Sequence, residues 1–187
     1  LKARLAYSTI SQLSYITLGV ALASSMGILG GGLHVVMHAM GKITLFMCAG
    51  SIYVATHRTE ISQMTGLGRR MPITFIAFLI GALSIIGLPP LGGSWSKWLL
   101  MVGAVDAEHL FILGVLLVSS LLNVAYLLPL VAKGFFLSND TDAELAQSAE
   151  ASPLVWGPPA ATAFGCVVLF FYAGHIQDFL MPIVATN

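Results

Sequence analysis

The segment from His34 to Gly50, HVVMHAMGKITLFMCAG, places two histidines and a lysine in an otherwise apolar run. His34, His38 and Lys42 follow one another at intervals of four residues. Because each helical residue turns by about 100°, these side chains share one sector of a helix over roughly 12 Å of its axis. An ionisable group at the centre of a membrane helix costs from about 2.5 to more than 10 kcal/mol, so such groups usually face protein or water and serve a function. The segment therefore predicts a membrane helix that carries a row of proton-exchanging groups.

The composition of the whole chain agrees with a membrane location. Its 187 residues are 57% hydrophobic and only 9% charged, whereas soluble domains have about 25% charged residues. Eight Lys plus Arg balance eight Asp plus Glu, so the chain lacks the strongly basic field that nucleic-acid binding requires. We therefore expect an integral membrane protein in contact with the lipid bilayer and no nucleic-acid partner.

Five apolar segments approach or exceed the roughly 20 residues that a spanning helix needs. They cover residues 5–24, 33–55, 73–105, 110–132 and 154–174. The third segment is too long for one crossing and is interrupted at residues 87–93, GLPPLGG, where proline removes backbone donors and glycine frees the backbone. We expect one discontinuous helix, because breaks of this kind mark ion sites in transporters. The alternative is an ordinary hairpin between two short helices, which gives six spans and a slightly weaker positive-inside pattern.

The predicted fold class is therefore all-α, a polytopic membrane helix bundle of about five spans. Between the first two spans, residues 24–32 are expected to form a glycine-rich turn. The chain starts without Met and has no cleavable signal pattern, so we expect a fragment or one half of a longer transporter.

The row of His34, His38 and Lys42 has two interpretations. The ordinary pKa values of His and Lys lie on either side of neutrality, at about 6.5 and 10.4, which favours a relay where Lys42 stores a proton and the histidines pass it on through ordered water. Alternatively, each imidazole bonds a neighbouring hydroxyl or carbonyl and simply joins helices. A zinc site is not expected, because zinc needs a third protein ligand and no HExxH motif is present. The chain also has no flavin, haem, cluster or nucleotide motif, so no cofactor is expected.

Lys97 follows the predicted break and is flanked by Trp95 and Trp98. We expect it to be a second buried proton carrier near the middle of the membrane. The alternative is a lysine that extends its ammonium to the membrane interface, within an aromatic belt.

Polar side chains also recur at helical spacing in the first and fourth spans. Those in the first span share one face, and their hydroxyl and amide groups could hold water beside the histidines. Small hydroxyl residues also allow membrane helices to pack closely, and both roles stay open for each residue. The residues are Ser8, Ser11, Gln12 and Tyr15, then Ser119, Ser120, Asn123 and Tyr126.

Three motifs in this order resemble those of the antiporter-like membrane proteins. They are LKARLAYSTISQLSY at residues 1–15, the segment at 34–50, and GLPPLGGSWSK at 87–97. That family includes the A and D components of Mrp-type cation/proton antiporters, membrane hydrogenase subunits, and the large proton-pumping membrane subunits of respiratory complex I. The resemblance is strong over residues 1–137 and loose thereafter.

The resemblance implies that the chain holds most of the second of two inverted repeats and the last helix. Residues 1–137 would be the C-terminal part of the proton-conducting domain, and 153–187 the last transmembrane helix and tail. The polar composition of residues 138–152, which include Glu150, indicates a solvated linker between them. In the family motif at the break a phenylalanine stands where this chain has Ser94, so the local shape of the break is left open.

The resemblance further implies a membrane protein like the Mrp D component, which translocates protons as one subunit of a cation/proton antiporter complex. It assigns proton transfer to Lys42, Lys97, His34 and His38, with Lys2 as a further candidate. Expected partners are other membrane subunits of a hetero-oligomeric complex in the cell's inner (plasma) membrane, with protons and sodium or potassium as transported ions. Two alternatives stay open. One is a proton-pumping subunit of an NADH-quinone oxidoreductase or membrane hydrogenase, and the other is a non-transporting assembly subunit.

Overall fold

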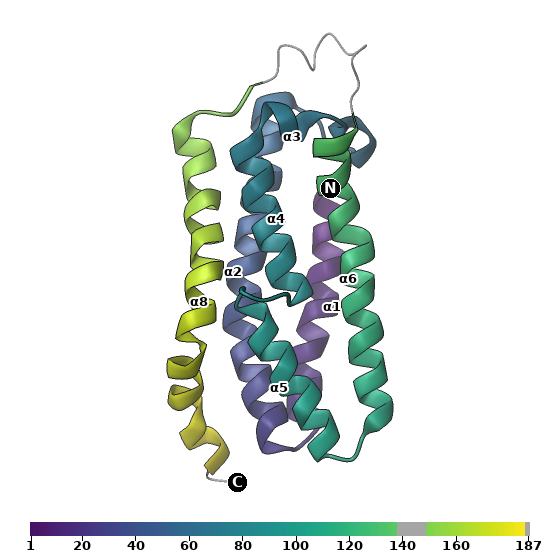
Figure 1. Ribbon diagram of the computed structural model, residues 1–187, viewed down its shortest axis with the longest axis vertical. Helices are drawn as coiled ribbons and strands as arrows, with labels where there is room; N and C mark the ends of the chain where they lie inside the picture. Colours follow the sequence, from purple (N-terminus) through teal and green to yellow (C-terminus); the bar gives the residue numbers. More distant parts are fainter. Residues whose placement is uncertain (138–148, 186–187) are drawn as a thin grey trace.

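The computed structural model describes residues 1–137 and 149–185, and its regular elements in these ranges are all helices (Figure 1). The elements are α1 (Lys2–Ala21), α2 (Ser25–Thr56), the short 3-10 helix η1 (Ile61–Met64), α3 (Leu67–Arg70), α4 (Pro72–Ile86), α5 (Gly93–Asp106), α6 (Leu110–Phe136) and α8 (Pro153–Ala185). The expected all-α fold is confirmed. Most of the expected polar linker, 138–152, and the last two residues lie outside the described ranges.

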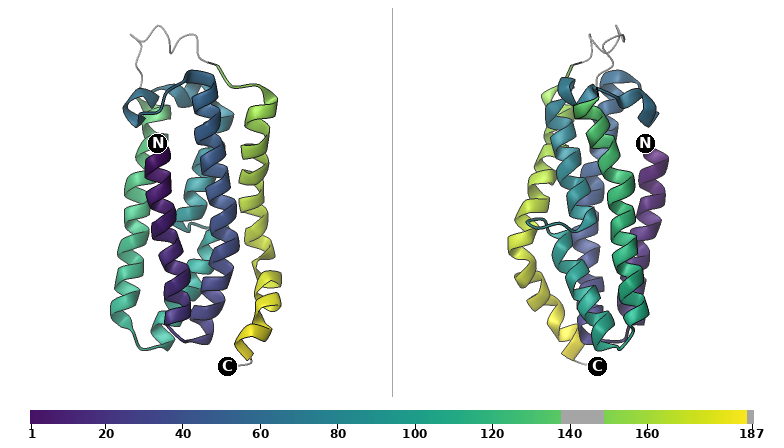
Figure 2. Two further views of the ribbon diagram at one scale, coloured as in Figure 1. Left: turned by 180° about the vertical axis from the view of Figure 1, so that it is seen from behind. Right: turned by 45° about the vertical axis from the view of Figure 1, so that its right-hand side comes forward.

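The long helices run along one common axis and form an elongated bundle (Figures 1 and 2). α2 is central, because it packs against α1, α4, α5 and α8. α6 packs against α4 and α5 on the side of the bundle opposite α8 (Figure 1). The helix that carries the histidines and Lys42 is therefore packed against four other helices of the chain, and it keeps an exposed face that includes Val35, Ile43 and Val54.

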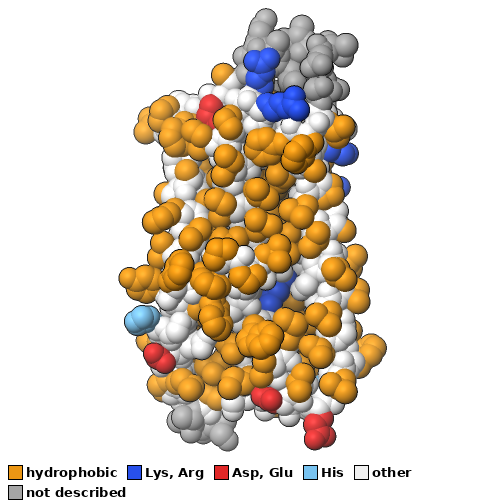
Figure 3. All heavy atoms as spheres, in the orientation of Figure 1, with side chains coloured by type: hydrophobic (Ala, Val, Ile, Leu, Met, Phe, Trp, Pro, Cys, Tyr) orange, Lys and Arg blue, Asp and Glu red, His pale blue; other side chains and the backbone are white. Residues whose placement is uncertain are grey.

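Three of the described helices have the length and composition of membrane spans. Ser25–Thr56, Leu110–Phe136 and Pro153–Val184 are each long and apolar enough to cross a membrane, and Pro72–Ile86 is a shorter apolar helix. The face of the bundle that Figure 3 shows is covered mainly by hydrophobic side chains. Because water does not favour so large an apolar surface, this face is suited to lipid or to other membrane proteins.

α4 and α5 are the two halves of one interrupted helix. α4 descends from one end of the bundle to its middle, and α5 continues from there to the other end (Figure 1). α4 ends at Ile86, and Gly87, which caps it, has a φ of 92°, a conformation that only glycine adopts readily. The loop is held against α8 by a hydrogen bond from the Gly92 amide to the Cys166 carbonyl, at 3.1 Å. The predicted discontinuous helix is confirmed, and the hairpin alternative is wrong.

Most of the basic side chains visible in Figure 3 lie at one end of the bundle and most of the acidic ones at the other, with one basic side chain in a hollow between the ends. The connection between α2 and α4 contains three arginines, and Lys133 lies in the last turn of α6 at the same end. Asp106 and Glu108 lie at the other end, where α5 passes into α6. This distribution agrees with the positive-inside pattern expected for five spans.

The glycine-rich turn expected at 24–32 is wrong. α2 begins at Ser25, so these glycines lie in its first turns, and the connection from α1 is confined to residues 22–24. The Ser24 hydroxyl accepts a hydrogen bond from the Gly27 amide at 3.1 Å and so caps the helix. The glycines instead let helix backbones approach closely: a Cβ at Gly27 would lie 2.9 Å from the carbonyl oxygen of Gly19 on α1.

Two glycines provide a matched test of this close packing. A Cβ at Gly103 of α5 would lie 2.6 Å from the Cα of Gly27, whereas a Cβ at Gly114 of α6 would meet nothing within 4 Å. We expect Gly103→Ala to lower the midpoint of thermal unfolding, because α2 and α5 must separate and overpacking costs about 1–3 kcal/mol. Gly114→Ala should leave the midpoint unchanged or raise it, since alanine favours a helix by up to about 1 kcal/mol. The measurement is loss of helical circular dichroism in detergent, and equal midpoints for the two variants would contradict the packing described.

The segment before α8 is tied to the start of α4. The Glu150 carboxylate accepts hydrogen bonds from the Ile73 amide, at 3.0 Å, and from the Thr74 hydroxyl. A carboxylate is favoured at a helix N-terminus, where the amides lack partners within the helix and the helix dipole is positive. Glu150 therefore caps α4, although it was expected to belong to a solvated linker.

Candidate functional site

The predicted row of ionisable side chains is buried in the bundle. His34, His38 and Lys42 are only 2%, 7% and 5% exposed. The two imidazole rings are stacked, with centroids 5.9 Å apart and an interplanar angle of 9°. The four-residue spacing thus places the three side chains along one side of α2, as helix geometry requires.

Lys42 is held by α1. Its Nζ donates hydrogen bonds to the Ser8 hydroxyl, at 2.6 Å, and to the Leu5 carbonyl, at 3.3 Å. Both acceptors are neutral. They can hold an ammonium while it carries a proton, and they add no charge that would oppose release of the proton.

A chain of hydrogen bonds continues from Ser8 between α1 and α6. The Ser8 and Tyr126 hydroxyls are 2.5 Å apart, and Tyr126 donates to the Asn123 side-chain carbonyl at 2.5 Å. The Gln12 amide nitrogen also donates to Asn123 Oδ1, at 3.1 Å. Ser8, Gln12 and Asn123 are at most 3% exposed, so their hydrogen-bond partners are protein groups and not bulk water.

His34 joins this chain to α5. Its Nε2 lies 3.2 Å from Gln12 Oε1, and its Nδ1 lies 2.9 Å from the Ser96 hydroxyl. We name the seven hydrogen-bonded side chains the polar row. It runs from Lys42 through Ser8, Tyr126, Asn123, Gln12 and His34 to Ser96. The polar row therefore draws on four helices and ends at the residue that precedes Lys97.

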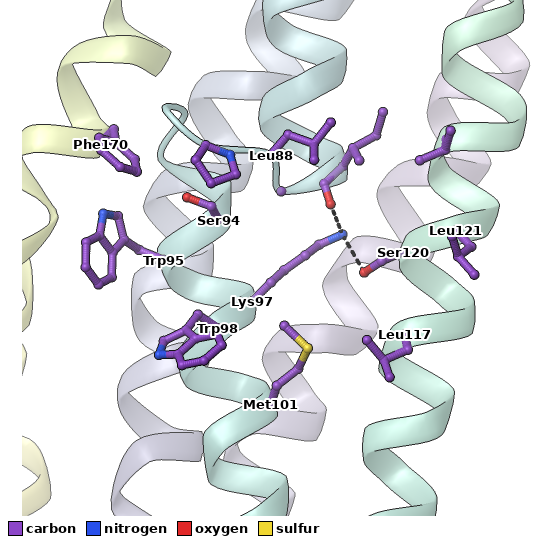
Figure 4. Close-up of a pocket in the computed structure, with 14 residues that line it drawn as sticks. Leu88, Ser94, Trp95, Lys97, Trp98, Met101, Leu117, Ser120, Leu121 and Phe170 are labelled. Carbon is purple, nitrogen blue, oxygen red and sulfur yellow. Dashed lines mark hydrogen bonds between the residues drawn. The ribbon is translucent and has the colours of Figure 1, made fainter.

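Lys97 lies at the break between α4 and α5 (Figure 4). Its Nζ donates to the Ile86 carbonyl, at 3.0 Å, and to the Ser120 hydroxyl, at 3.2 Å. A carbonyl in the last turn of a helix has no partner within that helix, so the end of α4 supplies an acceptor for the ammonium. Lys97 is only 4% exposed. This position is inside the bundle and does not fit the alternative of a lysine at the membrane interface.

The Tyr15 ring contacts both Lys97 and His34. The Lys97 Nζ lies 5.1 Å from the centroid of the Tyr15 ring, and that ring stacks on His34 with centroids 5.4 Å apart. The Tyr15 hydroxyl and His38 Nε2 are both buried without a hydrogen-bond partner among the described residues. A buried polar atom without a partner is costly, so water molecules are expected beside these two atoms.

A pocket of about 830 Å³ adjoins Lys97. Its walls are mainly apolar and include Leu88, Trp95, Trp98 and Leu121 (Figure 4). In the space-filling view, a basic side chain is visible in a hollow of the apolar face (Figure 3). Lys97 thus has neutral acceptors on one side and an apolar pocket on the other.

Lys2 is not brought together with the other candidates. It is exposed at the start of α1, and its Nζ lies 5.1 Å from the centroid of the Tyr53 ring. No hydrogen bond joins it to the polar row in the described part of the chain. Among residues 1–137 and 149–185, no group of three or more His, Cys, Asp or Glu side chains is placed to hold a metal ion.

Ser96 was missed by the sequence analysis. Its side chain is fully buried, and its hydroxyl forms a hydrogen bond with His34 Nδ1. A single serine beside a lysine in an apolar helix has no helical periodicity that could have indicated this bond. Ser11, by contrast, was singled out by its spacing in the first span, but it is exposed. Only the packing of α5 against α2 brings Ser96 to the histidine.

The Tyr126 hydroxyl is the only link of the polar row between Ser8 and Asn123 in the hydrogen bonds described above. We expect Tyr126→Phe to slow the proton transport that the sequence predicts several-fold, although Tyr126 does not pass the proton on itself. The substitution leaves Ser8 and Asn123 each without one partner, a loss of about 1–3 kcal/mol for buried groups, and so disturbs the hydroxyl that holds Lys42. The measurement is the rate of dye-reported pH change in vesicles that carry the assembled complex. Tyr172→Phe, which removes a half-exposed hydroxyl on α8, is the matched control and should transport normally. Equal rates for the two variants would show that the Tyr126 link has no role in transport.

Residues 1–123 match the model of a protein family described as NADH:quinone oxidoreductase/Mrp antiporter, transmembrane. Among curated relatives, NADH-quinone oxidoreductase subunit N of Desulforudis audaxviator is 40% identical over 131 residues, which cover 70% of this chain and 26% of that protein. NADH-quinone oxidoreductase subunit L of Rickettsia bellii is 31% identical over an alignment of 188 positions, which covers all of this chain and 28% of that protein. The chain therefore spans little more than a quarter of the length of these relatives.

Solved structures share the fold over nearly the whole chain. A chain of the Mrp complex from Dietzia sp. DQ12-45-1b superposes with a TM-score of 0.85 at 23% identity, over 97% of this chain and 41% of that one. A chain of respiratory complex I from Thermus thermophilus with bound NADH gives 0.84 at 25% identity, over 98% and 38% of the two chains. The same fold thus occurs in chains of two kinds of membrane complex.

Proposed function

Because the chain belongs to the NADH:quinone oxidoreductase/Mrp antiporter transmembrane family, we propose that it translocates protons as part of an antiporter-like membrane subunit. Protons move laterally between Lys42 and Lys97 by way of the buried histidines. The observation that carries this proposal is the polar row, which lies inside an apolar bundle and has a buried lysine at or beside each end. Such a concentration of buried polar groups is costly in a membrane, and transport is a function that accounts for the cost.

In this mechanism the charge of one lysine acts on the other. Lys42 and Lys97 each bind and release a proton at Nζ, and both hold the charged state with neutral acceptors. Two unit charges about 10–15 Å apart interact by roughly 1–2 kcal/mol at an effective dielectric constant of 20. That energy changes a proton-binding equilibrium by about tenfold. Loss of a proton at one lysine therefore favours proton uptake at the other.

Water completes the route in this proposal. His38 lies one helical turn from both His34 and Lys42, and its Nε2 has no protein partner in the described structure. A water molecule at this atom would link the histidines to Lys42 without passing through the side chains of α6. The proton path belongs to residues 1–137, and α8 supports it by holding the loop at the break.

Other membrane subunits are the proposed partners. The pocket beside Lys97 lies on the apolar face of α5 and α6, where a lysine next to lipid tails would be unfavourable. Covering this face with another protein removes that cost. The two structural relatives described above come from multisubunit membrane complexes, an Mrp complex and a respiratory complex I, which supports the same proposal. The cell's inner (plasma) membrane is the proposed location, with the arginine-rich end inside.

Two kinds of complex can use such a subunit, and they predict different responses. In a cation/proton antiporter, addition of sodium or potassium drives proton movement. In an NADH-quinone oxidoreductase or a membrane hydrogenase, electron transfer drives it. The two curated relatives are NADH-quinone oxidoreductase subunits, which favours the oxidoreductase, whereas the superposition on a chain of the Mrp complex favours the antiporter.

The experiment uses everted vesicles that carry the complete complex and a pH-sensitive dye. Sodium, potassium, or NADH with a quinone is added to wild type and to a double variant, Lys42→Met with Lys97→Met. We expect proton movement with one class of driver in wild type and none in the double variant, at equal amounts of assembled complex. Equal proton movement in both would contradict the proposal and favour a non-transporting assembly subunit.

A further inference from the structure

The direction of each hydrogen bond in the polar row is determined by one backbone carbonyl. Asn123 Nδ2 donates to the carbonyl oxygen of Ser119 at 2.9 Å. A carbonyl oxygen can only accept, so the side chain of Asn123 cannot be rotated to exchange its oxygen and nitrogen. Its Oδ1 therefore faces Tyr126 and Gln12 and accepts from both.

On the Lys42 side, the remaining directions follow in turn. Tyr126 must donate to Asn123 Oδ1, so its oxygen accepts the hydrogen of the Ser8 hydroxyl. Ser8 in turn accepts from Lys42 Nζ. This branch is a run of proton donors that ends at an amide oxygen. Because a neutral amide has no acidic proton to pass on, the branch cannot carry a proton from Lys42 through Asn123.

On the other side, the same carbonyl selects the tautomer of His34. Gln12 Nε2 is used to donate to Asn123, so Gln12 presents Oε1 to His34 Nε2. That nitrogen must then carry a hydrogen. In the neutral ring Nδ1 is consequently the unprotonated nitrogen, and it faces the Ser96 hydroxyl at 2.9 Å.

Ser96 has two acceptors for its single hydrogen. One is His34 Nδ1, and the other is the carbonyl oxygen of Gly93 at 3.1 Å. When His34 is neutral, the hydroxyl donates to Nδ1. When a proton binds the Nδ1 lone pair, the new N–H donates to the Ser96 oxygen, and the hydroxyl hydrogen turns to Gly93. Both charge states of the ring are then fully hydrogen-bonded, with no other bond made or broken.

We infer that Ser96 is a positioning residue that lets His34 gain and lose its proton at Nδ1, on the side of α5, while Gln12 and Asn123 hold the ring in the Nε2–H tautomer. The consequence for transport rests on the proposed function, whereas the hydrogen-bond assignment does not. The titratable groups around the ring are Tyr15, which stacks on it from α1, and His38, one turn along α2. The third is Lys97 of α5, whose Nζ lies over the Tyr15 ring.

The first test is nitrogen-15 NMR of the full complex in bilayers with labelled histidine, in which a His34→Gln variant identifies the His34 signals. We expect an unprotonated, hydrogen-bonded Nδ1 in the neutral ring, and a change in its shift in Ser96→Ala. Ser94→Ala is the matched control, because Ser94 lies two residues away and donates to the Leu91 carbonyl instead. A protonated Nδ1 in the neutral ring, or the same Nδ1 shift in wild type and Ser96→Ala, would overturn the inference.

The second test measures proton transport by the same complex. We expect Ser96→Ala to reduce the rate about tenfold, as the loss of a hydrogen bond to a charged group does, and Ser96→Thr to restore most of it because the hydroxyl is kept. A normal rate in Ser96→Ala, in membranes where Lys42→Met abolishes transport, would overturn the role of Ser96 alone. Normal transport in Lys42→Met would instead overturn the proposed function, and the NMR result would still decide the hydrogen-bond assignment.

Discussion

Lys42→Met is expected to abolish proton translocation while the complex still inserts and assembles. The substitution removes the ionisable group at one end of the polar row and leaves a flexible, unbranched side chain of similar length in a buried site. Removal of a side chain that transfers protons typically lowers a rate by about 100-fold or more. The measurement is the initial rate of dye-reported pH change, normalised to the amount of assembled complex.

Lys133→Met is the matched control for this prediction. It makes the same chemical change, but Lys133 is exposed in the last turn of α6 and does not belong to the polar row. Its rate should stay within about twofold of wild type, since surface substitutions usually change stability by less than about 0.5 kcal/mol. If both variants lose transport equally, the loss reflects total charge or assembly and not the proton path.

Lys97→Arg is expected to abolish transport although it keeps the positive charge. An arginine side chain does not release its proton at physiological pH. The adjoining pocket of about 830 Å³ has room for the larger guanidinium, so the substitution need not disturb the bundle. The variant therefore separates a lysine that exchanges protons from a lysine that only supplies a charge.

The comparison for Lys97→Arg needs a control with the same change. Lys133→Arg serves this purpose, because its side chain is exposed. Transport at the wild-type rate in Lys97→Arg would mean that Lys97 acts only through its charge. A group other than Lys97 would then have to bind and release the proton on this side of the path.

The helix geometry of the site was predictable, because it depends only on local sequence. A spacing of four residues places His34, His38 and Lys42 on one side of any α-helix. The two prolines and the glycines at 87–93 disfavour a continuous helix wherever they occur. The three ionisable side chains on one side of α2 and the broken helix therefore appear in the structure as the sequence predicted them.

The partners of these groups could not be predicted, because they depend on contacts between helices that are distant in the chain. Ser8 and Tyr126 are 118 residues apart, and Gln12 and Asn123 are 111 residues apart. The sequence showed that these four polar residues recur at helical spacing. It did not distinguish hydrogen bonds between helices from close packing of small side chains. Ser96 gave no signal at all, since its role depends on where α5 meets α2.

The glycines of α2 show why one residue type permits opposite interpretations. Between two apolar runs, several glycines indicate a turn because glycine costs a helix about 1 kcal/mol relative to alanine. In a membrane bundle the same residues let helices approach, and this contact outweighs the low helix propensity. Gly27 and Gly103 have this second role, with their backbones in direct contact. The choice depends on tertiary packing, which the local sequence does not contain.

The central claim is that protons pass through the two buried lysines, and the rate of proton translocation by Lys42→Met next to Lys133→Met tests it most directly. Both variants are measured in the same vesicle preparation, with the complete complex and the driver that works for wild type. The account predicts a loss of about 100-fold in Lys42→Met and an essentially unchanged rate in Lys133→Met. An equal, near wild-type rate in both variants would contradict it.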